Sequence, residues 1–362
     1  MKQIGYIFVL FVAIFFLTSC ETPQDQNATR QNEQIQTTPS VALSTVYASS
    51  VMSGVYNQYS DLNISLVTFN VTNNEDSSVS LTFISEIQDY SSESKSTEII
   101  PAHTTKIITQ NPLIKPGIDI KEMVTANLYF KVVSSTGSII DEKTVPIKLY
   151  AKDTMVWAAV ENGELVDTSV LIAAWVTPHE KEIDELIRLS AENHPTKSIE
   201  GYQCSDCKTD DDWAKYTSLQ VQAIYDTLKN NYKITYINAP IAYSGKEESS
   251  QRVKLPKEAI NLASANCIDG TVLFASALES VGINPKLVIT PGHAFLCWDV
   301  NEKGEMVDCL ETTMIGNSDY IDANNKGLDE YREEVNNGNF NNGTSKVISI
   351  ALLREVGIHS MN

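Results

Sequence analysis

Residues 266–313, NCIDGTVLFASALESVGINPKLVITPGHAFLCWDVNEKGEMVDCLETT, decide the fold of the C-terminal half of the chain. Residues 268–281 within this stretch are apolar on nearly all sides, which is typical of a helix buried in the middle of a domain. A strand is predicted at 286–290, and His293 opens a second one. One buried helix followed by paired strands predicts a mixed α+β domain.

Cys267 stands at the predicted N-terminus of the buried helix. The unpaired N–H groups and the macrodipole at this end of a helix favour a thiolate over a thiol. Nucleophilic catalysis needs the thiolate, because the thiolate is the attacking species. A lone cysteine is more often a buried structural residue. The presence of His293, one of five histidines, is what makes Cys267 a candidate nucleophile.

The turn between the last two strands selects the acid that would orient the histidine. Residues 301–304, Asn-Glu-Lys-Gly, suit a type I turn with glycine in the left-handed position, which closes a three-residue hairpin loop. In this register the strand after the turn runs to Thr313, which lies opposite His293. Glu311 on that strand then shares the face of His293. A two-residue loop would instead place Asp308 on that face. Glu311 is therefore the preferred acid, and Asp308 is the alternative.

The remaining cysteines divide into two pairs and one single thiol. The hairpin register places Cys297 opposite Cys309, as a cross-strand disulfide in an oxidising compartment or as two small apolar residues. Cys204 and Cys207 form a second candidate pair. Their CSDC motif could instead hold a metal ion, but it lacks a second ligand pair at zinc spacing, and no metal site is predicted. Cys267 is left unpaired.

Together these motifs resemble the transglutaminase-like superfamily, a group of cysteine peptidases and acyltransferases of papain-like fold. In this family a cysteine at a helix N-terminus is followed by a histidine that opens a strand and by an acid on the next strand. NCIDG, PGHAFLCW and DCLETT follow that order. The family's last motif usually has aspartate two positions before threonine, and here Glu311 stands in its place. The resemblance covers roughly residues 155–362 and includes WVTPHEKEIDELIRL, GYQ and QRVKLPKEAI upstream.

The resemblance implies a catalytic triad of Cys267, His293 and Glu311, with Gln251 before the RVKLP motif as a candidate oxyanion donor. It implies a peptidase, amidase or acyltransferase that cleaves amide bonds of a protein or peptide substrate through a thioester. Hydrolysis is preferred over cross-linking, and no metal or organic cofactor is required. The alternative is a non-catalytic papain-like scaffold in a surface binding protein, which the glutamate at the acid position and the extra cysteines favour.

The start of the chain resembles an export signal. Residues 4–17 are an apolar run, which is shorter than the ~20 residues that a membrane-spanning helix needs. The LTSC that ends at Cys20 resembles a lipobox, so Cys20 is expected to carry the lipid that anchors the chain to the membrane. An ordinary secretory signal with a chance cysteine is the alternative. We expect a signal peptide at 1–19, a disordered tether at 20–40, and a lipoprotein of the bacterial cell envelope, on its periplasmic or cell-surface face.

Residues 41–152 alternate between apolar and polar residues. This period of two predicts an antiparallel β-sandwich of about seven strands, similar to immunoglobulin or fibronectin type III domains. The region has no cysteine, which excludes an immunoglobulin domain pinned by a disulfide, and we expect a spacer or binding module. The clearest strands are at 67–71, 79–83, 124–132 and 145–149.

Helical patterns return after the sandwich, so a second domain is predicted at 153–362. One helix is expected to start at Thr177 through a Thr-Pro-His-Glu capping box, and another is expected from about Asp210 to Lys229. The run of three aspartates from Asp210 complements the positive end of that helix better than it suits a cation site. The formal net charge of −19 would repel phosphate backbones, which argues against a nucleic-acid partner.

Overall fold

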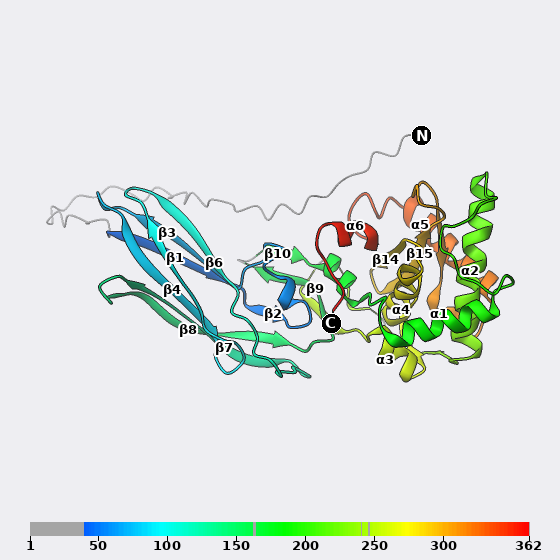
Figure 1. Ribbon diagram of the computed structural model, residues 1–362, viewed down its shortest axis with the longest axis horizontal. Helices are drawn as coiled ribbons and strands as arrows, with labels where there is room; N and C mark the ends of the chain where they lie inside the picture. The colour runs from blue at the N-terminus through cyan, green and yellow to red at the C-terminus, as the bar shows by residue number, and fades with distance from the viewer. Residues whose placement is uncertain (1–39, 162–163, 240, 245–246, 362) are drawn as a thin grey trace, which may run out of the picture. The chain divides into compact units, whose positions relative to one another are not determined.

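The computed structural model describes residues 40–161, 164–239, 241–244 and 247–361 (Figure 1). The predicted signal peptide, Cys20 and all but the last residue of the predicted tether lie outside the described residues. The described residues form one compact unit that is rich in β-sheet and carries several helices. Within the described residues, no helix is both long and apolar enough to span a bilayer.

The N-terminal half is built from two β-sheets. The four strands predicted from the alternation are all present, within a total of eight described strands. Pairing is antiparallel except between β2 and β8, which run parallel. The first sheet has the order β1-β3-β6, with β1 (Val41–Tyr47), β3 (Val67–Asn73) and β6 (Thr105–Gln110). The second has the order β2-β8-β7-β4-β5, with β2 (Ser50–Met52), β4 (Val79–Ile87), β5 (Ser94–Ile100), β7 (Val124–Ser134) and β8 (Ile139–Tyr150).

An aromatic layer joins these two sheets. The ring of Phe69 on β3 lies 5.1 Å from that of Phe83 on β4 and 6.1 Å from that of Phe130 on β7. All three side chains are fully buried. Because successive residues of a strand point to opposite faces, this layer also explains the alternating burial along β3. The two sheets therefore form a sandwich.

The chain after β8 mixes helices with short strands. Its sheets have the orders β10-β9-β12, β11-β13 and β16-β15-β14-β17. The helices are α1 (Lys181–Asn193), α2 (Asp210–Asn230), α3 (Pro256–Asn261), α4 (Cys267–Ser280), α5 (Tyr320–Asn336) and α6 (Ile350–Glu355), with 3₁₀ turns η2 (Ser169–Trp175) and η3 (Thr312–Gly316). A further 3₁₀ turn, η1 (Tyr56–Gln58), lies in the N-terminal half. The strands are β9 (Thr154–Glu161), β10 (Glu164–Asp167), β11 (Thr235–Tyr236), β12 (Ser249–Arg252), β13 (Ser264–Ala265), β14 (Pro285–Thr290), β15 (His293–Asp299), β16 (Val307–Leu310) and β17 (Lys346–Ser349).

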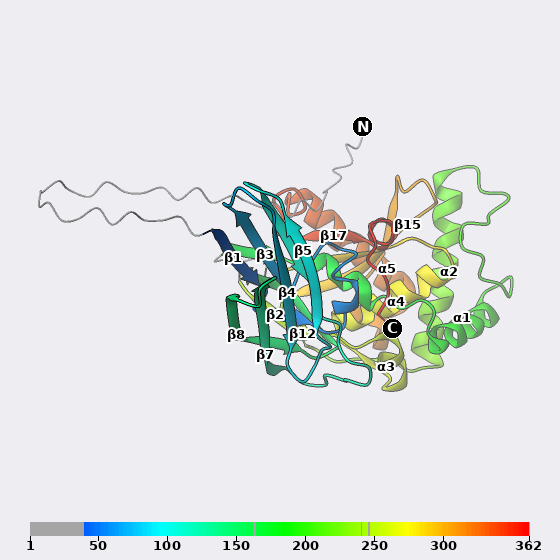
Figure 2. The same ribbon diagram turned by 60° about the vertical axis from the view of Figure 1, so that its left-hand side comes forward.

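Helix α4 is the centre of this second half. All residues from Cys267 to Leu278 are buried, as the apolar pattern predicted. One side of the helix contacts β14 and β15, and α1 and α2 cover another side (Figures 1 and 2). Asn266 caps the helix by accepting a hydrogen bond from the Asp269 N–H at 2.8 Å, and the Asp269 carboxylate accepts from the Asn266 N–H at 3.1 Å. This capping box fixes where the helix begins.

The hairpin of β15 and β16 has the predicted register. Cys297 pairs with Cys309, and Gly304 has a φ of +68° in the three-residue loop. Strand β16 is shorter than predicted, because it ends at Leu310 and not at Thr313, and the chain turns into η3. The Glu311 N–H donates to the carbonyl of Ala323 on α5 at 2.9 Å instead of continuing the ladder, so the pairing predicted for His293 is not formed.

The two predicted helix starts had different outcomes. Helix α2 begins at Asp210 as predicted, with Thr209 as its cap. The start predicted at Thr177 is wrong, because α1 begins at Lys181. The Thr177 N–H donates to Ser276 Oγ of α4 at 2.9 Å, so this buried threonine packs against α4 and does not cap α1.

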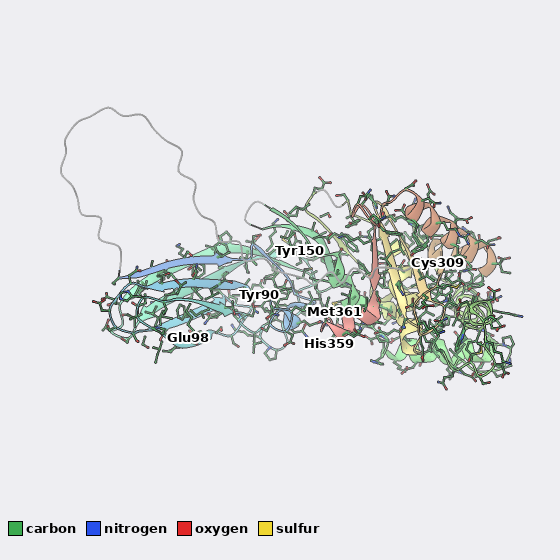
Figure 3. The ribbon with its side chains drawn as sticks, turned by 90° about the horizontal axis from the view of Figure 1, so that it is seen from above. Tyr90, Glu98, Tyr150, Cys309, His359 and Met361 are labelled. Carbon is green, nitrogen blue, oxygen red and sulfur yellow. A yellow bond between two sulfur atoms is a disulfide. The ribbon has the colours of Figure 1, made fainter. Side chains whose placement is uncertain are left out.

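The hydrophobic core continues across the predicted boundary at 152/153. Leu149 on β8 and Trp157 on β9 belong to the same buried cluster. The end of the chain also reaches the sandwich side, because Gln58 exchanges two hydrogen bonds with the backbone of His359, at 2.9 and 2.7 Å. In Figure 3, His359 and Met361 are labelled between Tyr150 of β8 and Cys309 of β16. The division into two domains stays a prediction from the sequence.

Candidate active site

Cys267 is the first residue of α4 and the free cysteine of the described residues. Its side chain is 1% exposed, and Sγ lies 4.0 Å from the carbonyl oxygen of Ala239. The positive end of the helix macrodipole therefore acts on a thiol that is largely shielded from water. Both conditions strengthen the influence of the neighbouring charges on that thiol.

His293 opens β15 beside Cys267. The side chain of Cys267 interacts with the imidazole and is one of the causes that raise the pKa of His293. On the other side of the ring, Nε2 lies 2.6 Å from Oε2 of Glu311. A carboxylate can only accept, so Nε2 carries the proton and the second ring nitrogen is the one available to exchange a proton with the thiol. The structure thus brings Cys267, His293 and Glu311 together from three separate elements.

Glu311 follows β16 and is the N-cap of η3. Its carboxylate is 3% exposed and engages both oxygens, because Oε1 accepts from the Thr313 N–H at 2.8 Å while Oε2 accepts from His293. A buried carboxylate held at both oxygens has one orientation, and that orientation fixes the plane of the imidazole. This is the acid that the three-residue hairpin loop favoured.

Asp308, the alternative acid, is not a partner of His293. Its Oδ1 accepts from Nδ2 of Asn324 at 2.7 Å and from the Cys309 N–H at 2.9 Å. Burial raises the pKa of this carboxyl, and the two hydrogen bonds partly offset the effect. Asp308 pairs with Trp298 in the ladder, so the observed register places it away from the face that His293 uses. The correction follows from the length of the hairpin loop.

A second carboxylate that the sequence did not point to also reaches the histidine. Oε2 of Glu330 on α5 lies 3.6 Å from Nε2 of His293, and Lys326 pairs with Oε1 of Glu330 at 3.0 Å. Burial alone would lower the pKa of His293, but the interactions with Cys267, Glu311 and Glu330 outweigh it and raise the pKa to about 12. The imidazole therefore favours its charged form.

The same network lowers the pKa of Glu330. Burial opposes the shift, but the interactions with His293 and Lys326 bring the pKa down to about 2. The helical spacing of Lys326 and Glu330 is the signal present in the sequence, and it predicts an ordinary surface ion pair. The contact with His293 depends on how α5 packs and could not be read from that spacing.

Gln251, the predicted oxyanion donor, lies on β12 opposite Met155 of β9. Its Oε1 accepts from Nε1 of Trp157 at 3.3 Å and from the Ala242 N–H at 2.6 Å. These bonds tie β12 to the segment that follows Ala239, the residue whose carbonyl faces Cys267. In the part of the chain that the structure describes, no contact joins Gln251 to Cys267 itself. The oxyanion role stays a prediction.

Two disulfides account for the other described cysteines. Cys297 is bonded to Cys309 and Cys204 to Cys207, which leaves no thiolate for a metal at the CSDC motif. Among the described residues, one group has ligand atoms close enough for a metal ion, within 4.8 Å of one another. The group consists of His293, Glu311 and Glu330. These side chains already bond to one another, and we assign them to a proton network.

Comparisons with known proteins leave the family open. No family model and no curated protein matches the chain. Among solved structures, the exo-chitosanase CsxA of Amycolatopsis orientalis matches with 10% identity and a TM-score of 0.21, covering 54% of this chain and 28% of that one. A variant of this chitosanase in complex with PNP-beta-D-glucosamine gives the same identity and TM-score and covers 66% and 31%. The chain thus spans about a third or less of that enzyme, and a TM-score this low supports no argument.

The raised pKa of His293 predicts a pH-dependent stability. In a Cys267→Ala background, where no thiol titrates at this site, the folded protein keeps a proton that the unfolded chain loses above its ordinary pKa of ~6.5. This stabilisation is complete below that pH and is lost as the pH rises towards the folded pKa. The free energy of unfolding should therefore fall by ~1.4 kcal/mol per pH unit between about pH 7 and about pH 9 because of His293.

Urea unfolding at several pH values measures this slope. Adding His293→Gln to the Cys267→Ala background should remove it. Adding His103→Gln, the same substitution at an exposed position, should leave it in place. Equal slopes in all three proteins would show that His293 is not held as an imidazolium.

Proposed function

We propose that the chain is an exported bacterial lipoprotein whose C-terminal half is a transglutaminase-like domain acting on amide bonds. The observation that carries this proposal is the series Cys267–His293–Glu311, in which Nε2 of His293 lies 2.6 Å from Glu311 and the side chain of Cys267 interacts with the same ring. Its members come from the N-terminus of a helix, the start of a strand and the residue that directly follows the next strand. That order matches the arrangement implied by the resemblance. Nucleophile, base and orienting acid are the three roles that acyl transfer by a thiol requires.

The surroundings of the triad support a papain-like domain. The buried helix α4, with the nucleophile at its first residue, packs against the antiparallel sheet that carries the histidine. The reacting groups thus lie where the N-terminal end of α4 meets the start of β15, and both elements are rigid. Such preorganisation is what a catalytic constellation needs.

The mechanism we propose starts from the ion pair in which the Cys267 proton already resides on His293. The thiolate attacks the carbonyl carbon of an amide, so that a C–S bond forms and the oxygen becomes an oxyanion. The backbone N–H of Cys267 and the side-chain amide of Gln251 are the proposed donors to this oxyanion. Collapse of the intermediate breaks the C–N bond, and the leaving amine takes its proton from the imidazolium of His293.

The thioester that results is resolved by water. His293, neutral after the amine has left, removes a proton from the attacking water, the C–S bond breaks as the acid product leaves, and the thiolate–imidazolium pair is restored. Glu311 holds the imidazole in the required tautomer throughout. No metal or organic cofactor takes part. We favour hydrolysis of a protein or peptide over cross-linking by analogy with bacterial members of the superfamily.

A second candidate function is a surface binding protein with a non-catalytic papain-like scaffold. The observation that favours it is the 1% exposure of Cys267, since a nucleophile must meet its substrate. The glutamate at position 311, where the family usually has aspartate, points in the same direction. In this case the triad would be a structural hydrogen-bond network.

Cleavage of a peptide library in H₂¹⁸O, with dansylcadaverine as a competing amine, tests both candidates. The wild-type protein should release peptides whose new carboxyl groups carry ¹⁸O, because water resolves the thioester. Cys267→Ala should lower the rate by at least ~10³, because the nucleophile is lost while binding remains. Glu311→Gln should lower it less, and circular dichroism should show that both variants are folded.

Three outcomes separate the alternatives. Cleavage that survives in Cys267→Ala would contradict the mechanism. Transfer of dansylcadaverine to the library without ¹⁸O uptake would replace hydrolysis by cross-linking. Peptide capture without turnover, at equal affinity in wild type and Cys267→Ala, would favour the binding protein.

The lipid anchor is proposed from the LTSC motif and the apolar run before it. Cells expressing the full chain should incorporate labelled palmitate into the protein, and the protein should sediment with membranes. Cys20→Ala should abolish both, because the acceptor of the lipid is removed. Incorporation that persists in Cys20→Ala would place the lipid elsewhere or show that the anchor is a different one.

A further inference from the structure

Glu330 is the charged residue near the site that the proposed mechanism does not use. It lies on α5, and its side chain is 21% exposed. Oε1 pairs with Lys326, whereas Oε2 is buried and has no hydrogen-bond partner within bonding distance. The cationic group that faces Oε2 is His293, whose Nε2 lies 3.6 Å away. A buried carboxylate oxygen without a hydrogen bond costs free energy, and the facing imidazolium is what compensates for it.

Helix α5 is held against the end of β16 very closely. A Cβ atom on Gly327 would lie 2.6 Å from the backbone nitrogen of Leu310 and 2.8 Å from that of Glu311, so only glycine allows this approach. The Ala323 carbonyl accepts from the Glu311 N–H at 2.9 Å, and Asn324 Nδ2 donates to the Cys309 carbonyl at 2.7 Å. The helix that carries Glu330 therefore also fixes the backbone of Glu311.

The same helix is supported from the disulfide side of the hairpin. Cys297 and Cys309 lie in a small buried cluster against which Leu328 and Tyr331 of α5 pack. Leu328 and Tyr331 flank Glu330 in sequence, so their packing determines where the carboxylate points. Glu330 is thus placed by a rigid interface and does not reach the histidine by chance rotation of a surface side chain.

We propose that Glu330 is a positioning residue that, together with Glu311, keeps His293 in its imidazolium form and so maintains the thiolate–imidazolium pair with Cys267. This inference rests on the proposed function. Glu311 holds the proton of Nε2 directly, and Glu330 adds a second negative charge next to the same nitrogen. An opposite charge within ~4–6 Å favours the charged form of a titrating group, by about 1–3 pKa units for a close pair.

Three other titratable groups lie near Glu330 and His293: Lys326, Tyr236 and Cys267. Lys326 partly neutralises Glu330, but its side chain is 54% exposed, so its charge is screened by water. Tyr236 of β11 also faces the network, and burial raises its pKa, so it stays neutral. Cys267 also raises the pKa of His293, as Glu330 does. The net effect of Glu330 on His293 is therefore to favour the charged ring.

Carbon NMR of ¹³C-labelled histidine tests the inference without a substrate. The chain has five histidines, and His293→Gln assigns the resonance of interest. In the isosteric variant Glu330→Gln, the midpoint for deprotonation of His293 should fall at least about one pH unit below that of the wild type. Glu333→Gln removes the same charge from an exposed position of the same helix and should keep the wild-type midpoint. Glu330→Asp, which keeps the charge, should restore most of the shift.

The outcomes also separate this inference from the proposed function. A His293 that titrates near pH ~6.5 in the wild type would contradict the charged pair itself. A wild-type ring that stays charged, with a Glu330→Gln ring that stays charged to the same pH, would overturn the role of Glu330 and leave the triad intact. A Glu330→Gln variant that loses the fold while Glu330→Asp keeps the fold but not the wild-type midpoint would assign Glu330 a merely structural role.

Discussion

The burial of α4 on nearly all sides is the constraint on which the C-terminal half depends. A helix with no polar face needs a sheet on one side and other helices around it, and β14, β15, α1 and α2 supply these partners. Its N-terminus must then be satisfied inside the protein, which Asn266 and Asp269 achieve through the capping box. Cys267, the first residue of α4, consequently lies where the N-terminal end of the helix meets the start of β15. The burial that stabilises the domain also strengthens the electrostatic interactions between Cys267 and its neighbours, because buried charges are poorly screened.

A chain of hydrogen bonds and charges extends from that point. His293 lies between the thiol and two carboxylates, and each carboxylate is placed by a different device. Glu311 is fixed by the turn of the backbone into η3, and Glu330 is fixed by the close approach of α5 that Gly327 permits. The disulfide between Cys297 and Cys309 lies in the interface that holds α5. The charge state of the imidazole is thus tied to how tightly the hairpin and α5 pack, rather than to His293 alone.

The sequence was sufficient wherever one local pattern had one physical solution. The apolar run predicted α4, the alternation predicted strands of the sandwich, and Asn301 to Gly304 favoured the turn that sets the hairpin register. It failed where a distant element competed. Ala323 of α5 takes the hydrogen bond that would have extended β16, and Ser276 of α4 takes the N–H of Thr177. Glu330 could not be found, because its contact with His293 depends on the approach of a helix that local periodicity does not describe.

The central claim is that His293 activates Cys267, and the reactivity of that thiol tests it most directly. Alkylation of Cys267 by iodoacetamide can be followed by peptide mass spectrometry from about pH 5 to about pH 9, in the wild type and in His293→Ala. The disulfides keep the other described cysteines from reacting. The account predicts fast alkylation that persists well below the free-thiol pKa of ~8.5 and is lost in His293→Ala. Slow alkylation that rises only near that pKa in both proteins would contradict it.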